Sequence, residues 1–170
     1  MDEQYPAWYA ARTRSRHEKK VAASLSGQRL HTYLPLRRTW SSRRDRKITI
    51  EVPALPGYLF IHCTLSPQTR ALIKRSAGVL YLVESAGRPA AIPERQIHSL
   101  HAALAHANDV EHHPYPRLGG RVRVTRGPME GVEGYLVRIH QSRPRLMIAV
   151  DYVNQALSIE IDADYLEAVD

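Results

Sequence analysis

One stretch decides how this chain is organised: Leu55-Pro56-Gly57-Tyr58-Leu59-Phe60-Ile61-His62-Cys63. Pro56-Gly57 predicts a turn, and the apolar run after it has the length and composition of a β-strand. Because strand side chains alternate, Tyr58 and Phe60 share one face, while Leu59, Ile61 and Cys63 share the other. Both faces are apolar. Either helices cover both sides of this sheet, or one face is kept for a partner.

The positive charge of the protein lies in its first part. Residues 1–106 contain 17 Lys and Arg against 7 Asp and Glu, whereas residues 107–170 contain 7 against 10, and the whole chain carries a net charge of +7. A basic unit joined to a mildly acidic one predicts that the first part binds nucleic acid and the second binds something else. A basic surface that is merely solvated is the alternative.

The first part alternates strand and helix patterns around the central stretch. Strands are expected over 7–11, 30–36, 48–52 and 79–83. Ser15 and Glu18 fit a capping box at the start of a helix over about 16–26, Ser66 precedes a second helix, and Pro93 begins a third with one apolar face toward the sheet. Residues 1–107 are therefore predicted to form an α/β layer domain, with an antiparallel sheet and about three helices.

A basic segment over 37–47 interrupts this pattern. It has almost no core-forming residue, and it leads into the alternating segment from Ile48 to Val52. This arrangement predicts a protruding hairpin whose second arm returns to the central stretch. Trp40 stands among arginines, where it could stack on a nucleobase or on its own hairpin.

The second part has an all-β pattern. Residues 108–116 are polar, contain prolines and show no periodicity, which predicts a linker. After it, five short segments with strand composition recur at regular spacing, over 121–125, 135–139, 146–150, 156–161 and 165–169. Residues 117–170 are predicted to form a small five-stranded β-barrel.

The sequence offers little for catalysis. Cys63 is the only cysteine, so an internal disulfide and a cysteine-rich zinc site are excluded, and a buried core thiol is expected. Neither a phosphate-binding glycine loop nor a nucleophile elbow is present. His98 and His101 form the one metal-site candidate, with a solvated helix face as the alternative. We expect a non-enzymatic protein without a cofactor. The N-terminus lacks a basic and an apolar signal region, which predicts a cytosolic protein with no membrane partner.

These motifs, in this order, resemble the NusG family of transcription elongation factors. Trp8-Tyr9, followed by Glu18-Lys19-Lys20-Val21-Ala22, is similar to the start of the family's N-terminal domain, called NGN. Leu55-Pro56-Gly57-Tyr58-Leu59-Phe60 resembles its F-P-G-Y-hydrophobic signature, with Leu in place of the first Phe. Gly120-Arg121-Val122-Arg123-Val124, followed by Gly127-Pro128-Met129-Glu130-Gly131, resembles the KOW motif of the C-terminal barrel.

Two departures from the general NusG pattern point to a specialised member. The family's late F-G-R-x-T-P-V stretch is replaced here by the segment from Tyr152 to Glu160, and the hairpin is richer in arginine. Both features resemble paralogues of the RfaH, UpxY or LoaP kind, which act as antiterminators of particular operons. A general elongation factor and a ribosome-associated or RNA-binding KOW protein remain the alternatives.

The resemblance implies two sites and a set of partners. RNA polymerase would be bound at its clamp by Arg12, Leu55, Pro56, Tyr58, Phe60 and Leu82. The non-template DNA strand would be bound by Arg12, Arg14, Arg16, Lys19, Lys20, Arg43, Arg44, Lys74, Arg75 and Ser76. The barrel would bind a further partner, such as a small-subunit ribosomal protein, and we expect the factor to be a monomer.

Overall fold

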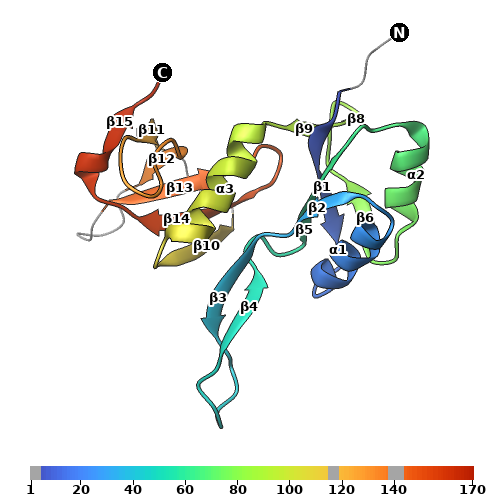
Figure 1. The fold of residues 1–170 in the computed structure, drawn as a ribbon, viewed down its shortest axis with the longest axis horizontal. Coiled ribbons are helices and arrows are strands. Elements are labelled where there is room, and N and C mark those ends of the chain that lie inside the picture. The colour runs from blue at the N-terminus through green and yellow to red at the C-terminus, as the bar shows by residue number, and fades with distance from the viewer. Residues whose placement is uncertain (1–4, 115–118, 138–143) are drawn as a thin grey trace.

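The computed structural model describes residues 5–114, 119–137 and 144–170, which form two main β-sheets with a helix between them (Figure 1). The N-terminal sheet has the order β2-β5-β1-β6, and β9 also pairs with β1. All of its pairings are antiparallel. Its strands are β1 (Ala7–Thr13), β2 (His31–Tyr33), β5 (Tyr58–Cys63), β6 (Val79–Leu82) and β9 (Ala91–Ile92). The predicted antiparallel α/β layer is confirmed.

One face of the N-terminal sheet is covered by two helices, α1 (Glu18–Gly27) and α2 (Pro67–Arg75). Leu59 and Ile61 of β5 lie on this face and are fully buried in a cluster with Val21 and Leu25 of α1 and Ile73 of α2. Cys63 is buried at the end of the same row. The predicted alternation of β5 is therefore confirmed for its core-facing side.

The two helices begin differently from each other. Ser66 caps α2 as expected, because its Oγ accepts a hydrogen bond from the Thr69 backbone N at 3.1 Å. The capping box predicted for α1 is wrong: the helix begins at Glu18, and His17 precedes it without a side-chain cap. The Glu18 side chain instead turns inward, where Oε1 accepts a hydrogen bond from the Gly57 backbone N.

The third helix, α3 (Glu94–His106), lies between the two main sheets (Figure 1). Ile97 and Leu100 are buried in one apolar cluster that also contains Trp8 and Phe60 of the N-terminal sheet. That cluster continues into the C-terminal sheet, where Leu146 and further apolar residues belong to it. The helix therefore packs against both sheets, rather than against the N-terminal sheet alone.

Within the described residues, the C-terminal sheet has six strands in the order β10-β14-β13-β12-β11-β15. They are β10 (Val110–Pro114), β11 (Arg121–Val124), β12 (Glu133–Val137), β13 (Arg145–Ala149), β14 (Gln155–Glu160) and β15 (Leu166–Ala168), which follows a 3-10 turn, η1 (Ala163–Tyr165). The five expected strands are present, and β10 is an additional edge strand.

The linker predicted over 108–116 is corrected by β10, which pairs with β14 along its whole length. Two histidine side chains hold it there: His112 Nε2 lies 2.9 Å from Gln155 Oε1, and His113 Nε2 lies 2.7 Å from Ser158 Oγ. The polar, proline-containing composition of this segment suggested a linker, but an edge strand also tolerates proline. Residues 115 and 116, and Ile139 of an expected strand, fall outside the described residues.

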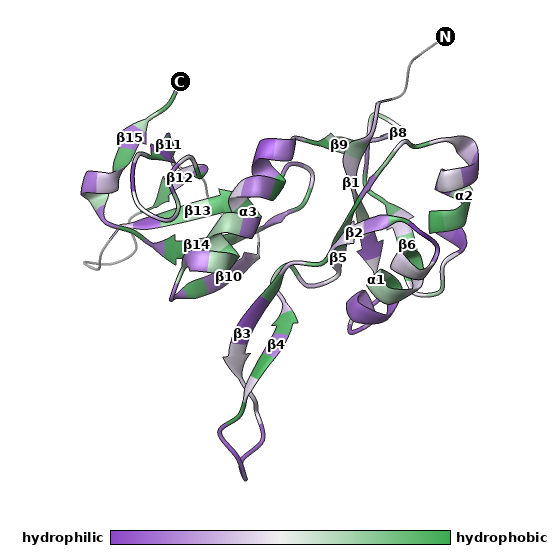
Figure 2. Ribbon diagram, in the orientation of Figure 1, coloured by the Kyte–Doolittle hydropathy of each residue, from purple (hydrophilic) through white to green (hydrophobic). Residues whose placement is uncertain are grey.

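Two small hairpins stand apart from the main sheets. The strands β3 (Leu36–Trp40) and β4 (Thr49–Pro53) form the protruding basic hairpin that the sequence predicted, and Figure 2 shows hydrophilic residues at its tip. A shorter hairpin joins β7 (Glu84–Ser85) and β8 (Arg88–Pro89). No helix in the described part of the chain has the length and hydropathy needed to cross a membrane.

Candidate functional site

Three side chains from neighbouring strands form a cationic and aromatic row on the N-terminal sheet. Arg12 of β1 is paired in register with Tyr58 of β5 on one side and with Tyr81 of β6 on the other. Its guanidinium lies 4.9 Å from the centroid of the Tyr58 ring, which is a cation–π distance. Half of Tyr81 is exposed, at 51%. We call these three residues the Arg12 row.

The turn at Pro56-Gly57 positions this row. Arg12 Nη1 donates a hydrogen bond to the Pro56 carbonyl at 3.3 Å, and the guanidinium passes so close to Gly57 that a Cβ there would collide with it. Gly57 also has a positive φ of 83°, a conformation that side-chain-bearing residues rarely adopt. The Gly57 carbonyl accepts from the Thr13 backbone N at 2.8 Å. The backbone conformation therefore favours glycine, and a side chain at this position would displace the Arg12 guanidinium.

Two of the apolar residues predicted to bind a partner are inaccessible here. Leu55 and Phe60 are fully buried, and both belong to the cluster that α3 and the C-terminal sheet complete. Phe60 stacks beside Tyr33, with ring centroids 6.4 Å apart. At the edge of this contact, Gln155 Nε2 of β14 donates to the Pro56 carbonyl at 2.9 Å. The face expected to be open is thus covered by the protein's own C-terminal part.

Leu82 lies on the opposite face from the row. It pairs with Ala11, is 1% exposed, and packs in the core beneath α1 and α2. Its position contradicts the predicted direct contact with a partner. Tyr81, which was not among the predicted binding residues, occupies the exposed position instead. Alternation along the strand places Tyr81 and Leu82 on opposite faces, so the sequence contained the signal for an exposed tyrosine.

The predicted basic set gathers around Gly78 at the end of α2. Arg14 N donates to the Gly78 carbonyl at 2.8 Å, and a Cβ on Gly78 would press against Val21 and His17 of the neighbouring segment. This contact brings the start of α1 next to the end of α2. The exposed basic residues carried by these two segments are Arg14, Arg16, Lys19, Lys20, Lys74 and Arg75.

The remaining members of that set are arranged differently. Ser76 lies in the same place but is half-buried, and its Oγ donates to the Leu72 carbonyl at 3.0 Å. Arg43 and Arg44 lie apart from the set, in the loop at the tip of the β3–β4 hairpin. The predicted nucleic-acid-binding residues therefore form two separate groups.

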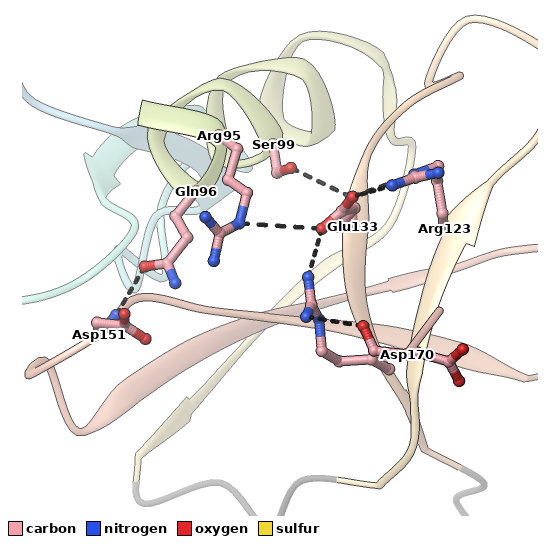
Figure 3. A network of polar contacts seen from close by, with 8 residues as sticks. Arg95, Gln96, Ser99, Arg123, Glu133, Asp151 and Asp170 are labelled. Carbon is pink, nitrogen blue, oxygen red and sulfur yellow. Dashed lines mark hydrogen bonds and ion pairs between the residues drawn. The ribbon is translucent and has the colours of Figure 1, made fainter. Parts of the chain in front are cut away.

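A polar network joins α3 to the C-terminal sheet, with Glu133 at its centre (Figure 3). Its carboxylate pairs with Arg123 at 2.6 Å and Arg121 at 2.8 Å, and Arg95 of α3 approaches it at 4.0 Å. The Glu133 backbone N donates to Ser99 Oγ at 3.2 Å. The hydrogen bond from Arg123 holds the pKa of Glu133 below its ordinary value. The short ion pairs thus lie within the C-terminal sheet, and Arg95 and Ser99 connect this sheet to α3.

The histidine pair is not assembled into a metal-binding group. His98 and His101 are both exposed, and the described residues contain no cluster of three His, Cys, Asp or Glu side chains that could hold a metal ion. The His101 ring instead lies 5.7 Å from the Tyr33 ring. Burial raises the pKa of the Cys63 thiol, which disfavours its reactive thiolate.

Comparison with known proteins relates this arrangement to one family. The family profile of NusG, described as transcription termination factor NusG, matches residues 6–101. The chain is 26% identical over 182 residues to the transcription termination/antitermination protein NusG of Borreliella burgdorferi, covering 96% of this chain and 98% of that protein. It is 23% identical over 174 residues to the protein of the same name from Yersinia pestis, covering 94% of each.

A similar fold is present in a solved structure described as "Domain interaction in Thermotoga maritima NusG". The likeness covers 98% of both chains with a TM-score of 0.60, at 18% sequence identity. At this identity the likeness concerns the fold alone.

Proposed function

The chain belongs to the NusG family, and from this premise we propose that it is a transcription elongation and antitermination factor that binds RNA polymerase and the non-template DNA strand. The observation that carries the proposal is the Arg12 row. An exposed tyrosine, a guanidinium and a second tyrosine stand side by side on a sheet of a small protein, and their arrangement is fixed by the Pro56-Gly57 turn. Such residues are typical of the energetic centres of protein interfaces.

The row suits a helical partner such as the polymerase clamp. Tyr58 and Tyr81 bury large areas while losing little conformational freedom, and the Arg12 fork supplies directional donors for carboxylates or carbonyls. A factor that binds only the closed clamp stabilises that state by its differential affinity, and it needs no chemistry of its own. Suppression of pausing then follows from binding alone.

The basic set around Gly78 is the part proposed to bind the non-template strand. Arginine and lysine side chains neutralise phosphates, and their contacts set the position of the factor on the strand. Arg14 and Arg16 follow the end of β1, within four residues of Arg12. One short segment thus connects the polymerase contact to the DNA contact.

The face of the N-terminal sheet that carries Leu55 and Phe60 cannot bind polymerase while the protein's own C-terminal part covers it. Leu55 and Phe60 become available to polymerase only when α3 and the C-terminal sheet move away from the N-terminal sheet. A protein that is mostly closed binds with an affinity reduced by its open fraction. We propose that the Arg12 row makes the first contact, since it is accessible in the closed arrangement.

The finer assignments are part of the same proposal. The arginine-rich hairpin and the segment from Tyr152 to Glu160 support a specialised antiterminator rather than a general NusG. We propose that residues 1–107 bind the polymerase and that the C-terminal part binds a further partner, such as a ribosomal protein. A KOW protein that binds ribosomes or RNA without polymerase is the competing function.

The experiment that tests this function is retention of bacterial RNA polymerase core enzyme on the immobilised full-length protein. The double variant Tyr58→Ala/Tyr81→Ala should lose at least tenfold in affinity. Tyr152→Ala is the matched control, because Tyr152 has a similar exposure of 52% and lies in the C-terminal part. Wild-type retention by a folded double variant, or retention of ribosomes in place of polymerase, would overturn the proposal.

A further inference from the structure

The β3–β4 hairpin extends from the N-terminal sheet as a ribbon that belongs to neither main sheet (Figure 1). Its two strands are paired from Leu36↔Pro53 to Trp40↔Thr49, and Ser41 N donates to the Ile48 carbonyl at 2.7 Å beyond them. The loop that remains at the tip comprises residues 42–47. We propose that this hairpin is a binding element for duplex DNA, separate from the basic set around Gly78.

The charge at the tip is strongly positive and uncompensated. The loop carries Arg43, Arg44, Arg46 and Lys47 against the single carboxylate of Asp45, and all five are exposed. Among the described residues, none of the four cationic side chains forms an ion pair or a side-chain hydrogen bond. Their charges are therefore free to neutralise phosphates, and the release of condensed counterions drives such binding.

The shape of the hairpin favours a duplex groove over a single strand. Single-stranded nucleic acid is bound by open grooves lined with several stacking platforms, whereas this element is convex and narrow. The major groove of B-DNA is about 12 Å wide and about 8.5 Å deep, and it admits a two-stranded ribbon. Five residues of strand span about 17 Å, so the tip can reach the groove floor while the sheet stays outside. The deep, narrow major groove of duplex RNA does not admit it.

Apolar side chains near the tip distinguish the hairpin from a solvated charged loop. Trp40 is 68% exposed, and the strand register places it on the same face as Arg38. Ile48 and Ile50 are exposed on the other face of the hairpin, where their cross-strand neighbours are Ser41 and Thr39. Exposed apolar groups beside arginines can contact sugars and thymine methyl groups, which a purely solubilising segment would not need.

The root of the hairpin is fixed, so the tip has a defined direction. Lys19 Nζ of α1 donates to the Glu51 carbonyl at 2.8 Å. Ala54 N donates to the Pro35 carbonyl at 2.8 Å, and both Pro35 and Ala54 are buried. The root of the ribbon is therefore anchored beside the basic helix, and an element that is already oriented loses less conformational entropy when it enters a groove.

The test compares two triple variants that remove the same charge. Arg43→Gln/Arg44→Gln/Arg46→Gln changes the tip, and Arg29→Gln/Arg88→Gln/Arg126→Gln changes three exposed arginines elsewhere. Binding of the full chain to a fluorescent DNA duplex of about two helical turns is measured by anisotropy across a salt series. The tip variant should lower the log-log salt slope by about 2.7, since each lost phosphate contact contributes about 0.9. The control should lower it by less than one.

Each other outcome overturns the proposal. Equal losses in the two variants would mean that overall charge, not the hairpin, binds DNA. A loss seen with the single strand but not with the duplex would make the partner single-stranded, and unchanged binding to both would leave an acidic protein as the partner of the tip. The assay contains DNA alone, so its result is independent of polymerase retention by the Tyr58→Ala/Tyr81→Ala variant.

Discussion

Glu18 and Gly57, which are 39 residues apart in the sequence, are joined by a buried hydrogen bond of 2.9 Å from the Gly57 backbone N to Oε1 of Glu18. The bond ties the first turn of α1 to the turn that precedes the central strand. Because Gly57 also contacts Arg12, this one contact links the basic helix to the Arg12 row. The glutamate is therefore structural, although its place in the sequence suggested a helix cap.

Replacing Glu18 by alanine should destabilise the protein by about 1–3 kcal/mol, because the Gly57 N–H would be buried without a partner. Glu18→Gln retains an accepting oxygen and should cost less. The measurement is the midpoint of urea unfolding, followed by circular dichroism. Equal midpoints for Glu18→Ala and wild type would mean that water replaces the carboxylate at no cost.

Gly57→Ala should be more harmful than the same change at Gly87. Both glycines have positive φ, at 83° and 77°, so each alanine adopts a strained backbone at a cost of about 1–2 kcal/mol. Only at Gly57 does the added Cβ also displace the Arg12 guanidinium, which then loses its hydrogen bond to the Pro56 carbonyl, whereas open space surrounds the Cβ at Gly87. Unfolding free energies of the two variants should therefore differ.

The Arg12 contribution can be isolated in a double-mutant cycle. In an Arg12→Ala background, Gly57→Ala should cost about as much as Gly87→Ala does in the wild type, because only the backbone strain remains. A cost at Gly57 that does not depend on Arg12 would contradict the close approach of the guanidinium to the turn.

The sequence determined much of this fold because its strands have clear local patterns. The alternation of Leu59, Ile61 and Cys63 against Tyr58 and Phe60 correctly separated the two faces of β5. This alternation does not show which distant part of the chain covers the face of β5 that carries Tyr58 and Phe60. Burial of Phe60 results from α3 and the C-terminal sheet, and no local pattern encodes that packing.

Two wrong predictions, the linker over 108–116 and the omission of Tyr81, concern strands at the edges of sheets. The strand β10 is polar because only part of it is buried, so it was mistaken for a linker. In β6, at the edge of the other sheet, Leu80 and Tyr81 are apolar yet half exposed. Edge strands lack one neighbour, and their composition is therefore a poor guide to their burial. Tyr81 was missed as a site residue for this reason.

Acid should destabilise the C-terminal sheet through Glu133, because the partners of its carboxylate, Arg123 and Arg121, lie on the neighbouring strand β11. Arg123, and then Arg121, lower the pKa of this carboxyl in the folded protein below its ordinary value of 4.5. The unfolded chain therefore binds the proton more readily. The stabilisation is complete above about pH 4.5 and is lost as the pH falls through the lower pKa of the folded state.

The check on this pH dependence is the free energy of unfolding between pH 3 and pH 7. Glu133→Gln should show a flatter curve than wild type at the acidic end and a lower stability at pH 7. The exposed Glu130→Gln, in the neighbouring turn, should follow the wild-type curve. Parallel curves for wild type and Glu133→Gln would show that the network contributes nothing that depends on this proton.

The basic set around Gly78 should reveal phosphate contacts through salt dependence. Lys20→Gln or Lys74→Gln should each lower the log-log salt slope of binding to a single-stranded oligonucleotide by about 0.7, which corresponds to one phosphate contact. Arg126→Gln, at an exposed position between β11 and β12 of the C-terminal sheet, is the control and should leave the slope unchanged. If Lys20→Gln and Lys74→Gln also leave it unchanged, these side chains only solubilise the protein.

Gln155→Ala should increase affinity for polymerase, provided that the closed arrangement competes with binding. The variant removes the hydrogen bond from Gln155 to the Pro56 carbonyl, which spans the two sheets at the edge of the Arg12 row. A net hydrogen bond contributes about 0.5–1.5 kcal/mol, so affinity should rise by about 2- to 10-fold.

Gln155 also contacts His112, so His112→Ala is the matched control, which disturbs β10 but keeps the bond to Pro56. Surface plasmon resonance with core polymerase measures both variants. An equal rise for His112→Ala would assign the effect to β10, and a fall for Gln155→Ala would mean that Gln155 itself contacts the polymerase.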